Sequence, residues 1–440
     1  MDTIVALSTP WGRSAIGTLR LSGEDARAVV EAVCPGGAQW HPRRASVRTA
    51  VDQEGQIIDE VLALWMPGPK SYTGEDVVEL SGHGNPVLLS ALMDALIAAG
   101  ARPARPGEFT RRALENGRTN LLHAEALNAL ISARTRAGAR DAQEGLSGRM
   151  AEEIDQITET LLDLAAELEA RLDHPDDDLS HQSDASICDQ LTDLSEQCAR
   201  TAATWSSSKL RLQGATVALI GPVNAGKSSL FNHLVGTQRA LVSDRPGTTR
   251  DVVERATLVD GMDITFLDTA GEGGTEDVIE QAGLAMGQSL SSDADLRLVV
   301  VPLSQPKHPS LESLLGRGSH ITVGTFADQD RHVDAPMVDY EVDNTTADGV
   351  IELRQQIRRM VGLEESQHQR VVVLSQRQHD LYRSVSTHCT EAKQALSGAL
   401  GPAVAASEIV YAIERLGELK GIDAREAVLD RLFSRFCIGK

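Results

Sequence analysis

The segment GPVNAGKS, residues 221–228, most constrains what this chain can fold into. It fits the pattern G-x-x-x-x-G-K-S, whose glycines let backbone N–H groups wrap around a phosphate. A strand-like run, ATVALIG, precedes it and a helical run, SSLFNHLVG, follows it. That helix adds the positive end of its dipole, while Lys227 would reach the β- and γ-phosphates and Ser228 would ligate Mg²⁺. The order of strand, glycine-rich loop and helix therefore predicts a nucleotide-binding α/β domain.

The surrounding region, residues 213–365, alternates strand-like and helical runs. The expected strands are ATVALIG, VVERATLV, DITFLD, LRLVVV and HITVGT. This alternation predicts a mostly parallel sheet with helices on both faces. Asp260-Gly261 lies between the second and third strands and is a turn signal for a hairpin, so one antiparallel edge strand is expected.

Two helical stretches flank this region. In 150–172 apolar residues recur at steps of three and four, which is typical of an amphipathic helix. They are Ile154, Ile157, Leu161, Leu164, Leu168 and Leu172. Residues 370–433 are also predicted to be helical. Because neither stretch has much core of its own, we predict one discontinuous helical domain, 119–212 and 366–440, with the 213–365 domain inserted in it.

Residues 1–118 mix short strands with helices. Four apolar runs punctuated by Gly and Pro are typical of strands: TIVALSTP, AIGTLRLSG, VLALWMPG and DVVELSGHG. PVLLSALMDALIAAG, at 86–100, is predicted to be a helix because Pro opens it and Gly lies just past its end. We therefore expect a multidomain α/β protein with an N-terminal α+β domain.

Composition excludes several classes of protein. The net charge of −21 argues against a surface that is basic all over. The five Arg of 102–118 form either a local basic patch or a solvated loop and helix. Five cysteines, without metal-ligand spacing, suit a reducing compartment. No signal peptide is visible, and no apolar run approaches about 18 residues. We expect a cytoplasmic protein that does not span a membrane.

Two polar elements follow the phosphate loop. In DRPGTTRD, Thr249 could ligate Mg²⁺ and sense the γ-phosphate; in DTAG, Asp268 could hold a Mg²⁺-bound water and the Gly271 amide could contact the γ-phosphate. Either element alone could be an ordinary turn. Their order and spacing behind the phosphate loop predict a GTPase of the switch-loop type.

This combination resembles the translation-factor-related GTPases and, within them, the MnmE (TrmE) family of tRNA modification GTPases. The resemblance runs end to end, through PGPKSYTGEDVVELSGHGNP, ARPGEFTRRALENGR, GPVNAGKSSLFN, PGTTRD, DTAG and the terminal FCIGK. The long N-terminal motifs and the terminus are more specific than the phosphate loop. The resemblance implies an N-terminal folate-binding domain, a split helical domain and an inserted Ras-like P-loop GTPase domain.

The resemblance also implies an activity. The family hydrolyses GTP and forms the carboxymethylaminomethyl or aminomethyl group at C5 of the wobble uridine of certain tRNAs. It works as a homodimer, in a heterotetramer with the FAD-dependent MnmG (GidA), and takes a one-carbon unit from 5-formyltetrahydrofolate or a related tetrahydrofolate. Its GTPase domains dimerise across the nucleotide and use K⁺ where other GTPases use an arginine finger. The implied cofactors are GTP, Mg²⁺, K⁺ and the folate.

The match assigns K⁺ to Asn224, Ser243, Arg245 and Thr248. The family has a small apolar pair where this chain has Arg245-Pro246. K⁺ activation survives if Arg245 contributes only its carbonyl, and weakens if its guanidinium competes. The implied nucleotide-binding residues are Asn224, Ala225, Gly226, Lys227, Ser228, Ser229, Ser243, Asp244, Arg245, Pro246, Gly247, Thr248, Thr249, Asp268, Thr269, Ala270, Gly271 and Asp328.

The catalytic set implied by the match is Glu280, Lys227 and Asn224. Glu280 lies in DVIEQAGL, where a carboxylate can orient the attacking water directly or through a second water. The alternative is a Glu on the surface of a helix.

The folate ligands implied by the match are Arg20, Glu79, Arg118 and Lys440, with Arg118 standing where Lys is also found. Cationic groups and a carboxylate suit the glutamate tail and the pterin edge of folate. Cys437, in the terminal Cys-x-Gly-Lys, is either a buried apolar filler or a reactive thiol beside the folate.

The base-recognition motif departs from the family's Asn-Lys-x-Asp. The aligned residues are Thr325, Phe326, Ala327 and Asp328. Asp343 and Asn344 replace the usual Ser-Ala of a later loop. Asp328 still favours guanine, because a carboxylate opposite N1 and C2–H of adenine would meet no donors there, and Phe326 could stack on the base. We expect GTP to be preferred over ATP, with weaker affinity and discrimination than is usual in the family.

Two other functions remain open on the sequence. One is a GTPase switch in ribosome assembly, against which the ELSGHGNP and FCIGK signatures count. The other is a nucleotide-gated scaffold with low turnover.

Overall fold

The computed structural model of the chain describes residues 2–36, 39–173, 182–222, 224–235, 252–259, 262–269, 294–309, 311–315, 319–343, 346, 348–360, 371–398, 400–422, 426–434, 436 and 439. It forms two compact units, one of Met1–Asn128 with Val410–Lys440 and the other of Ala129–Ile409. The domain boundaries predicted after residues 118, 212 and 365 stay predictions. Among the described residues, no helix has the length and apolar character needed to cross a membrane.

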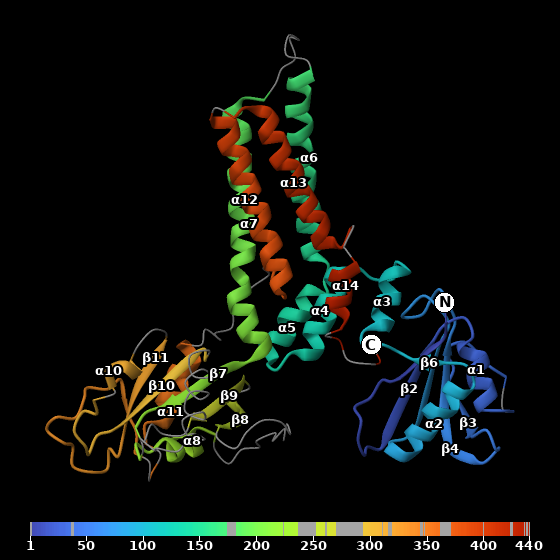
Figure 1. Cartoon of the computed structure of the whole chain (residues 1–440), viewed down its shortest axis with the longest axis horizontal. Coiled ribbons are helices and arrows are strands. Elements are labelled where there is room, and N and C mark those ends of the chain that lie inside the picture. Colours follow the sequence, from blue (N-terminus) through green and yellow to red (C-terminus); the bar gives the residue numbers. More distant parts are fainter. Residues whose placement is uncertain are drawn as a thin grey trace, which may run out of the picture. The chain divides into compact units, whose positions relative to one another are not determined.

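The first unit is built on a six-stranded sheet in the order β3-β4-β5-β2-β1-β6 (Figure 1). All neighbouring strands in it are antiparallel except β1 and β6. The strands are β1 (Ile4–Leu7), β2 (Ile16–Ser22), β3 (Ser46–Val51), β4 (Ile57–Met66), β5 (Val77–His83) and β6 (Arg102–Pro103).

Helices α1 and α2 form the core of this unit together with the sheet. Val30 of α1 and Leu96 of α2 are fully buried in one cluster with Leu19 of β2. Side chains alternate across a strand, so the residues on either side of Leu19 face away from this core. The helices of the unit are α1 (Ala26–Val33), α2 (Pro86–Ala98), α3 (Glu108–Glu115) and α14 (Glu426–Phe433); α4 (Leu121–Ser132) begins in it, and α13 (Pro402–Lys420) ends in it.

Helix α2 confirms the helix predicted at 86–100. Pro86 is its first residue, and the Asn85 side chain caps it by accepting a hydrogen bond from the Val87 N–H. Pro is favoured at this position because its missing N–H would have no partner within the helix. The start of this helix is therefore determined by two neighbouring residues of the sequence, Asn85 and Pro86.

The second unit contains a helical part whose segments come from both sides of an insert. Helix α7 precedes the insert and packs along α12, which follows it; Ser195 of α7 contacts Ser386 of α12 at 2.9 Å between hydroxyl oxygens. The predicted discontinuous helical domain is therefore confirmed. Its helices are α5 (Arg136–Gly145), α6 (Arg149–Asp173), α7 (Asp184–Gln213), α12 (Gln376–Ser397) and the beginning of α13 (Pro402–Lys420).

The predicted apolar stripe lies on α6. Its first five residues, from Ile154 to Leu168, are buried. Leu172, the sixth, is 43% exposed and lies in the last turn of the helix, which ends one residue later, at Asp173.

The insert is a second six-stranded sheet, in the order β12-β11-β10-β7-β9-β8. All neighbouring pairs are parallel except β8 with β9, which form an antiparallel hairpin at the edge. This confirms the predicted mostly parallel sheet with one antiparallel edge strand. The strands are β7 (Ala215–Ile220), β8 (Val252–Val259), β9 (Met262–Thr269), β10 (Leu296–Pro302), β11 (His320–Thr325) and β12 (Tyr340–Glu341).

Helices cover both faces of this second sheet. α8 (Lys227–Val235) and α11 (Val350–Met360) pack on the face that carries Val217, and α10 (Leu311–Leu314) packs on the face that carries Ala218. Alternate residues of β7 thus face opposite helical layers, which explains why every residue of the strand except Thr216 is apolar.

Candidate nucleotide and folate sites

The phosphate loop begins where β7 ends, at Gly221. This glycine has a φ of 155°, and a Cβ placed on it would lie 2.2 Å from the carbonyl oxygen of Val300 in β10. Only glycine fits this approach, so the start of the loop is fixed against the neighbouring strand. Further along, Asn224 and Gly226 both have left-handed backbones, with φ of 60° and 84°.

Lys227 is the first residue of α8 and is only 6% exposed. Its ammonium donates hydrogen bonds to the carbonyl oxygens of Gly221 and Pro222, at 2.9 and 2.8 Å. The cation is therefore held inside the loop, beside the N-terminal end of the helix dipole. Both features attract the oxygens of a phosphate. Ser228 and Ser229 follow on the first turn of the helix and are exposed.

The sheet register brings the other predicted elements to the same edge. Asp268, near the end of β9, is the backbone partner of Leu219 in β7. β11 runs parallel to β10 and ends at Thr325, directly before Phe326 and Asp328. Carboxyl ends of parallel strands meet at one edge, and ligands bind where the strand order switches direction, here around β7.

The base-recognition residues at this edge of the sheet differ in how far they are buried. The fully buried Thr325 donates its hydroxyl to the carbonyl oxygen of Ala225, 2.5 Å away. Phe326 is half-buried with a left-handed φ of 59°, and Asp328 is exposed. The carboxylate of Asp343 accepts a hydrogen bond from the Thr346 hydroxyl at 2.6 Å, so it is engaged within its own loop.

Several predicted site residues lie outside the described residues. These are Ser243, Asp244, Arg245, Pro246, Gly247, Thr248, Thr249, Ala270, Gly271, Glu280, Asn344, Cys437 and Lys440. Their assignments to K⁺, Mg²⁺, water activation and folate stay predictions. The backbones of Asp268 and Thr269 are described, without their side chains.

Arg20 and Glu79 form an ion pair on the N-terminal sheet. They are directly opposite in the register of β2 and β5, with Glu79 Oε1 at 2.9 Å from Nε and 2.8 Å from Nη2 of Arg20. Both side chains are about three-quarters buried. The guanidinium carbon also lies 5.9 Å from the ring centres of Tyr72 and of Phe109. A cation enclosed by aromatic rings and one carboxylate suits a planar anionic ligand.

The end of the chain reaches this ion pair. The carbonyl oxygen of Gly439 accepts a hydrogen bond from Nη1 of Arg20 at 3.3 Å. Gly439 is buried with a φ of 98°, and a Cβ there would lie 2.5 Å from the carbonyl oxygen of Leu7. The glycine of the terminal Cys-x-Gly-Lys is thus required by its close approach to β1.

Arg118 borders the same loop as Tyr72. A Cβ on Gly74, two residues after Tyr72, would lie 3.2 Å from Cγ of Arg118, whose side chain is exposed. The structure therefore brings Arg20, Glu79 and the chain end together and places Arg118 on the adjoining loop. Sequence reasoning missed Tyr72, Phe109 and Gly439, although all three lie within the motifs that carry the family resemblance.

A second polar pair lies at the end of β5. The ring nitrogen Nδ1 of His83 is 2.7 Å from Oδ1 of Asp59, and the His83 backbone N–H donates to Oδ2 at 2.8 Å. A Cβ on Gly82 would lie 2.6 Å from this carboxylate, which explains the glycine of SGHG. The hydrogen bond to Asp59, followed by the carboxylate's charge, raises the pKa of His83 above its usual 6.5.

We expect NMR titration to show a pKa for His83 above 6.5, and Asp59→Asn to lower it towards 6.5. Because the folded-state pKa is raised, the pair stabilises the fold below about pH 6.5, and this contribution is lost as pH rises through the pKa of His83. Asp94→Asn, on the exposed side of α2, is the matched control. Equal His83 titration in the Asp59 and Asp94 variants would contradict the assignment.

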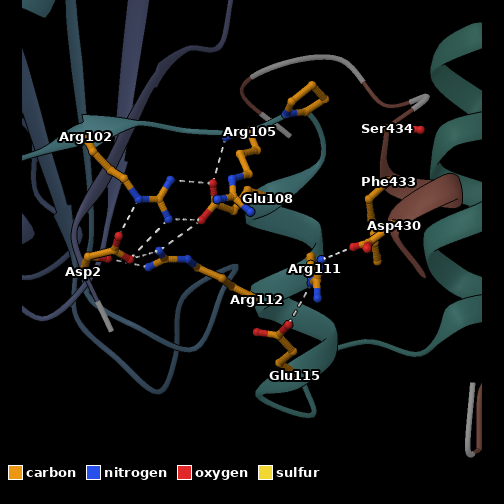
Figure 2. Close-up of a pocket in the computed structure, with 11 residues that line it drawn as sticks. Asp2, Arg102, Arg105, Glu108, Arg111, Arg112, Glu115, Asp430, Phe433 and Ser434 are labelled. Atoms are coloured by element: carbon orange, nitrogen blue, oxygen red, sulfur yellow. Dashed lines mark hydrogen bonds and ion pairs between the residues drawn. The ribbon is translucent and has the colours of Figure 1, made fainter. Parts of the chain in front are cut away.

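The predicted arginine-rich segment lines a pocket of about 520 Å³ (Figure 2). Arg102 bonds the carboxylates of Asp2 and Glu108, and Arg112 bonds the same two carboxylates. Arg111 pairs with Asp430 of α14 at 2.6 Å. Most of the positive charge is therefore compensated by carboxylates within the pocket, and these ion pairs join the segment to Asp2 and to α14.

Two family models match the chain. Residues 3–118 match "GTP-binding protein TrmE N-terminus", and residues 121–437 match "MnmE helical domain". The tRNA modification GTPase MnmE of Myxococcus xanthus (strain DK1622) is 40% identical over 443 residues, which cover 100% of this chain and 99% of that protein. The protein of the same name from Synechococcus sp. (strain RCC307) is 37% identical over 448 residues, covering 100% and 98%.

The chain belongs to the MnmE family. The resemblance predicted from the motifs is confirmed over the full length. Among solved structures, the G domain of the T. maritima FeoB iron transporter is 30% identical and covers 33% of this chain and 98% of that one, with a TM-score of 0.27. A score this low carries no argument. The case for a GTPase fold in this MnmE-family chain rests on its strand order, its phosphate loop and its family.

Proposed function

We propose that this chain is a GTP-hydrolysing enzyme that modifies tRNA. The observation that carries the proposal is the phosphate loop with its enclosed Lys227 ammonium, in a chain related end to end to proteins named tRNA modification GTPase. The loop supplies a cation, left-handed backbone turns and a helix N-terminus, which together suit the phosphates of a nucleotide.

Three described residues of the loop have a proposed part, and a fourth residue, Glu280, has one outside the loop. Lys227 binds the β- and γ-phosphate oxygens, and the exposed hydroxyl of Ser228 ligates Mg²⁺, which prefers oxygen ligands. The exposed side chain of Asn224 is an amide, whose oxygen suits K⁺. Bound cations neutralise charge that develops on the phosphates during transfer. Glu280 orients the attacking water, as the family match implies.

We further propose that Asp328 gives the chain its preference for GTP over ATP. Its carboxylate is exposed at the carboxyl edge of the sheet and is able to accept from the N1–H and 2-amino group of guanine. The same position offers adenine no comparable contact. Phe326 supplies an aromatic surface next to it.

The folate proposal rests on the N-terminal site. Arg20, Glu79 and the chain end at Gly439 lie together, and Lys440 and Cys437 are close to Gly439 in sequence. We propose that this site binds 5-formyltetrahydrofolate or a related tetrahydrofolate, as in the family. The finer chemistry, a homodimer and assembly with the FAD-dependent MnmG to form the carboxymethylaminomethyl or aminomethyl group on the wobble uridine, is proposed on the same grounds.

Arg20→Ala is expected to lower the affinity for 5-formyltetrahydrofolate by about 10- to 100-fold, since it removes a charged donor and leaves Glu79 without that partner. Isothermal titration calorimetry measures this directly. Arg27→Ala, which breaks an exposed ion pair with Glu31 on α1, is the matched control and is expected to bind normally. Equal affinities in the two variants would remove Arg20 from the folate site.

The proposed function is tested by mass spectrometry of tRNA from cells with and without the gene. Loss of the 5-substituent on the wobble uridine in the deletion strain, and its return with the gene, is the expected result. If the level of the modified wobble uridine is the same in the deletion strain as in cells with the gene, the tRNA assignment is overturned. Altered ribosome profiles with unchanged tRNA would favour a ribosome-assembly switch instead.

A further inference from the structure

A histidine and two glutamates meet where α12 and α13 lie side by side in the second unit (Figure 1). His388 and Glu391 come from α12, and Glu408 comes from α13. Nδ1 of His388 is 2.7 Å from Oε2 of Glu408 and 3.7 Å from Oε2 of Glu391. One nitrogen or oxygen of each residue lies within 4.8 Å of those of the other two. None of the three residues belongs to the nucleotide or folate site proposed above.

The helices bring these side chains together for simple geometric reasons. His388 and Glu391 are three residues apart in α12, so both project from the same side of the helix. α12 ends at Ser397 and α13 begins at Pro402. A connection this short makes the two helices antiparallel neighbours, so the chain turns back along α12 and brings Glu408 to His388.

The cluster lies at the rim of the helical core. The residues three before and one after His388 are fully buried, and the same holds for the residues three before and one after Glu408. These four core residues are Val385, Cys389, Ala405 and Ile409. The side chains of His388 and Glu408 are only 23% and 20% exposed, whereas that of Glu391 is 52% exposed. Two of the groups are therefore largely removed from water, and the third faces the solvent from which an ion would enter.

The charges of the cluster are unbalanced. Two carboxylates face one imidazole nitrogen, and Nδ1 carries at most one hydrogen to share between them. Among the residues that the structure describes, no Lys or Arg side chain pairs with Glu391 or Glu408. Neighbouring carboxylates repel each other, and a divalent cation bound between them removes that repulsion.

We propose that His388, Glu391 and Glu408 bind one Zn²⁺ or a similar divalent transition-metal ion, with water completing its coordination. Imidazole nitrogen and carboxylate oxygen are both zinc ligands, and helix bundles form metal sites from side chains on facing helices. Neighbouring ligand atoms of a tetrahedral zinc lie about 3.4 Å apart. The two distances from Nδ1 fall on either side of this value, so small side-chain rotations suffice to surround the ion.

The ion joins α12 to α13, since each helix supplies at least one ligand. A metal that binds only the folded arrangement stabilises it. Zinc binding at this place requires no nucleotide, folate or tRNA, and so goes beyond the proposed function. The imidazole ligand favours zinc over Mg²⁺ and Ca²⁺, which prefer sites made of oxygen atoms alone.

The test is a titration of the full chain, first freed of metal, with zinc chloride in competition with a chromophoric chelator. We expect one zinc per chain that depends on the cluster, with a dissociation constant of about micromolar or tighter. His388→Ala and Glu408→Gln should each weaken this binding at least about 100-fold, because changes next to a metal ligand alone cost about 10- to 100-fold. Glu391→Gln, on the exposed side, should weaken it at least about tenfold.

Two variants on the same helices serve as matched controls. His379→Ala removes another half-buried histidine of α12, whose Nδ1 lies 3.0 Å from the carbonyl oxygen of Ala202. Glu414→Gln removes an exposed carboxylate of α13. Both should bind zinc as the unaltered chain does. Thermal unfolding without zinc shows whether each variant is folded, and added zinc should raise the midpoint of the unaltered chain and the controls more than that of the cluster variants.

Equal zinc affinity in the unaltered chain and in folded Glu391→Gln and Glu408→Gln would overturn the proposal and leave an ion pair between His388 and Glu408. Failure of the unaltered chain to bind zinc would do the same, as would displacement of the zinc by excess Mg²⁺. With Co²⁺ in place of zinc, a thiolate charge-transfer band would assign the ion to cysteine and also overturn the proposal. All these outcomes leave the proposed GTPase function intact.

Discussion

Lys227→Met is expected to lower the affinity of the full chain for GDP and GTP at least about 100-fold, because two charge-assisted hydrogen bonds to phosphate oxygens are lost together. The ammonium is already enclosed by the carbonyls of Gly221 and Pro222, so the unaltered loop needs little rearrangement to receive the phosphates. Methionine fills a similar volume without the charge. Titration with a fluorescent GDP analogue measures the loss.

The control for this variant is Lys209→Met, which removes an exposed lysine on α7 and is expected to bind normally. Thermal unfolding without nucleotide shows whether the Lys227 variant is folded, since the same change leaves the carbonyls of Gly221 and Pro222 without this donor. A folded Lys227→Met protein that binds GDP within a few-fold of the unaltered chain would exclude the loop as the nucleotide site.

The second large effect is expected in turnover. Glu280→Ala should slow GTP hydrolysis by about 10²- to 10⁴-fold, the usual contribution of a group that positions or deprotonates a nucleophile. Its affinity for GTP should stay close to that of the unaltered chain, because the carboxylate is assigned to the water and not to the nucleotide. Single-turnover phosphate release at saturating Mg²⁺ and K⁺ separates hydrolysis from binding.

Glu276→Ala is the matched control, since it removes a carboxylate four residues earlier in the same segment. We expect it to hydrolyse GTP at nearly the normal rate. Similar hydrolysis by the two variants would remove Glu280 from the mechanism and leave it as a surface residue. The test is needed because Glu280 lies outside the described residues and its role rests on the family match.

The fold of the insert was predictable because its signals are local. β7, β10 and β11 are mostly apolar, with VALI in β7, LVVV in β10 and ITV in β11, which is what strands covered on both faces require. The N-terminal sheet was harder to predict. β3, with the sequence SVRTAV, is weakly apolar and has one side exposed, and β6 has only two residues. Their places in the sheet depend on strands that lie far away in sequence.

Of the two candidate sites, one is formed by a single short segment and the other by residues far apart in the sequence. The phosphate loop was predictable residue by residue, since its carbonyls, its left-handed turns and Lys227 all come from one eight-residue segment. The folate site was reached only through the family resemblance. Arg20 and Gly439, which make its central contact, are 419 residues apart. No periodicity or spacing relates positions at that separation.

The sequence by itself determined the phosphate loop, the order of strands and helices around it, the split helical domain and the family. These depend on short-range rules of backbone conformation and on the period of apolar residues. Only the tertiary structure decided that Asp59 pairs with His83, that the chain end lies on Arg20, and that Thr325 holds Ala225. Each of these contacts joins residues whose distance is set by sheet register and packing, which no local stretch of sequence specifies.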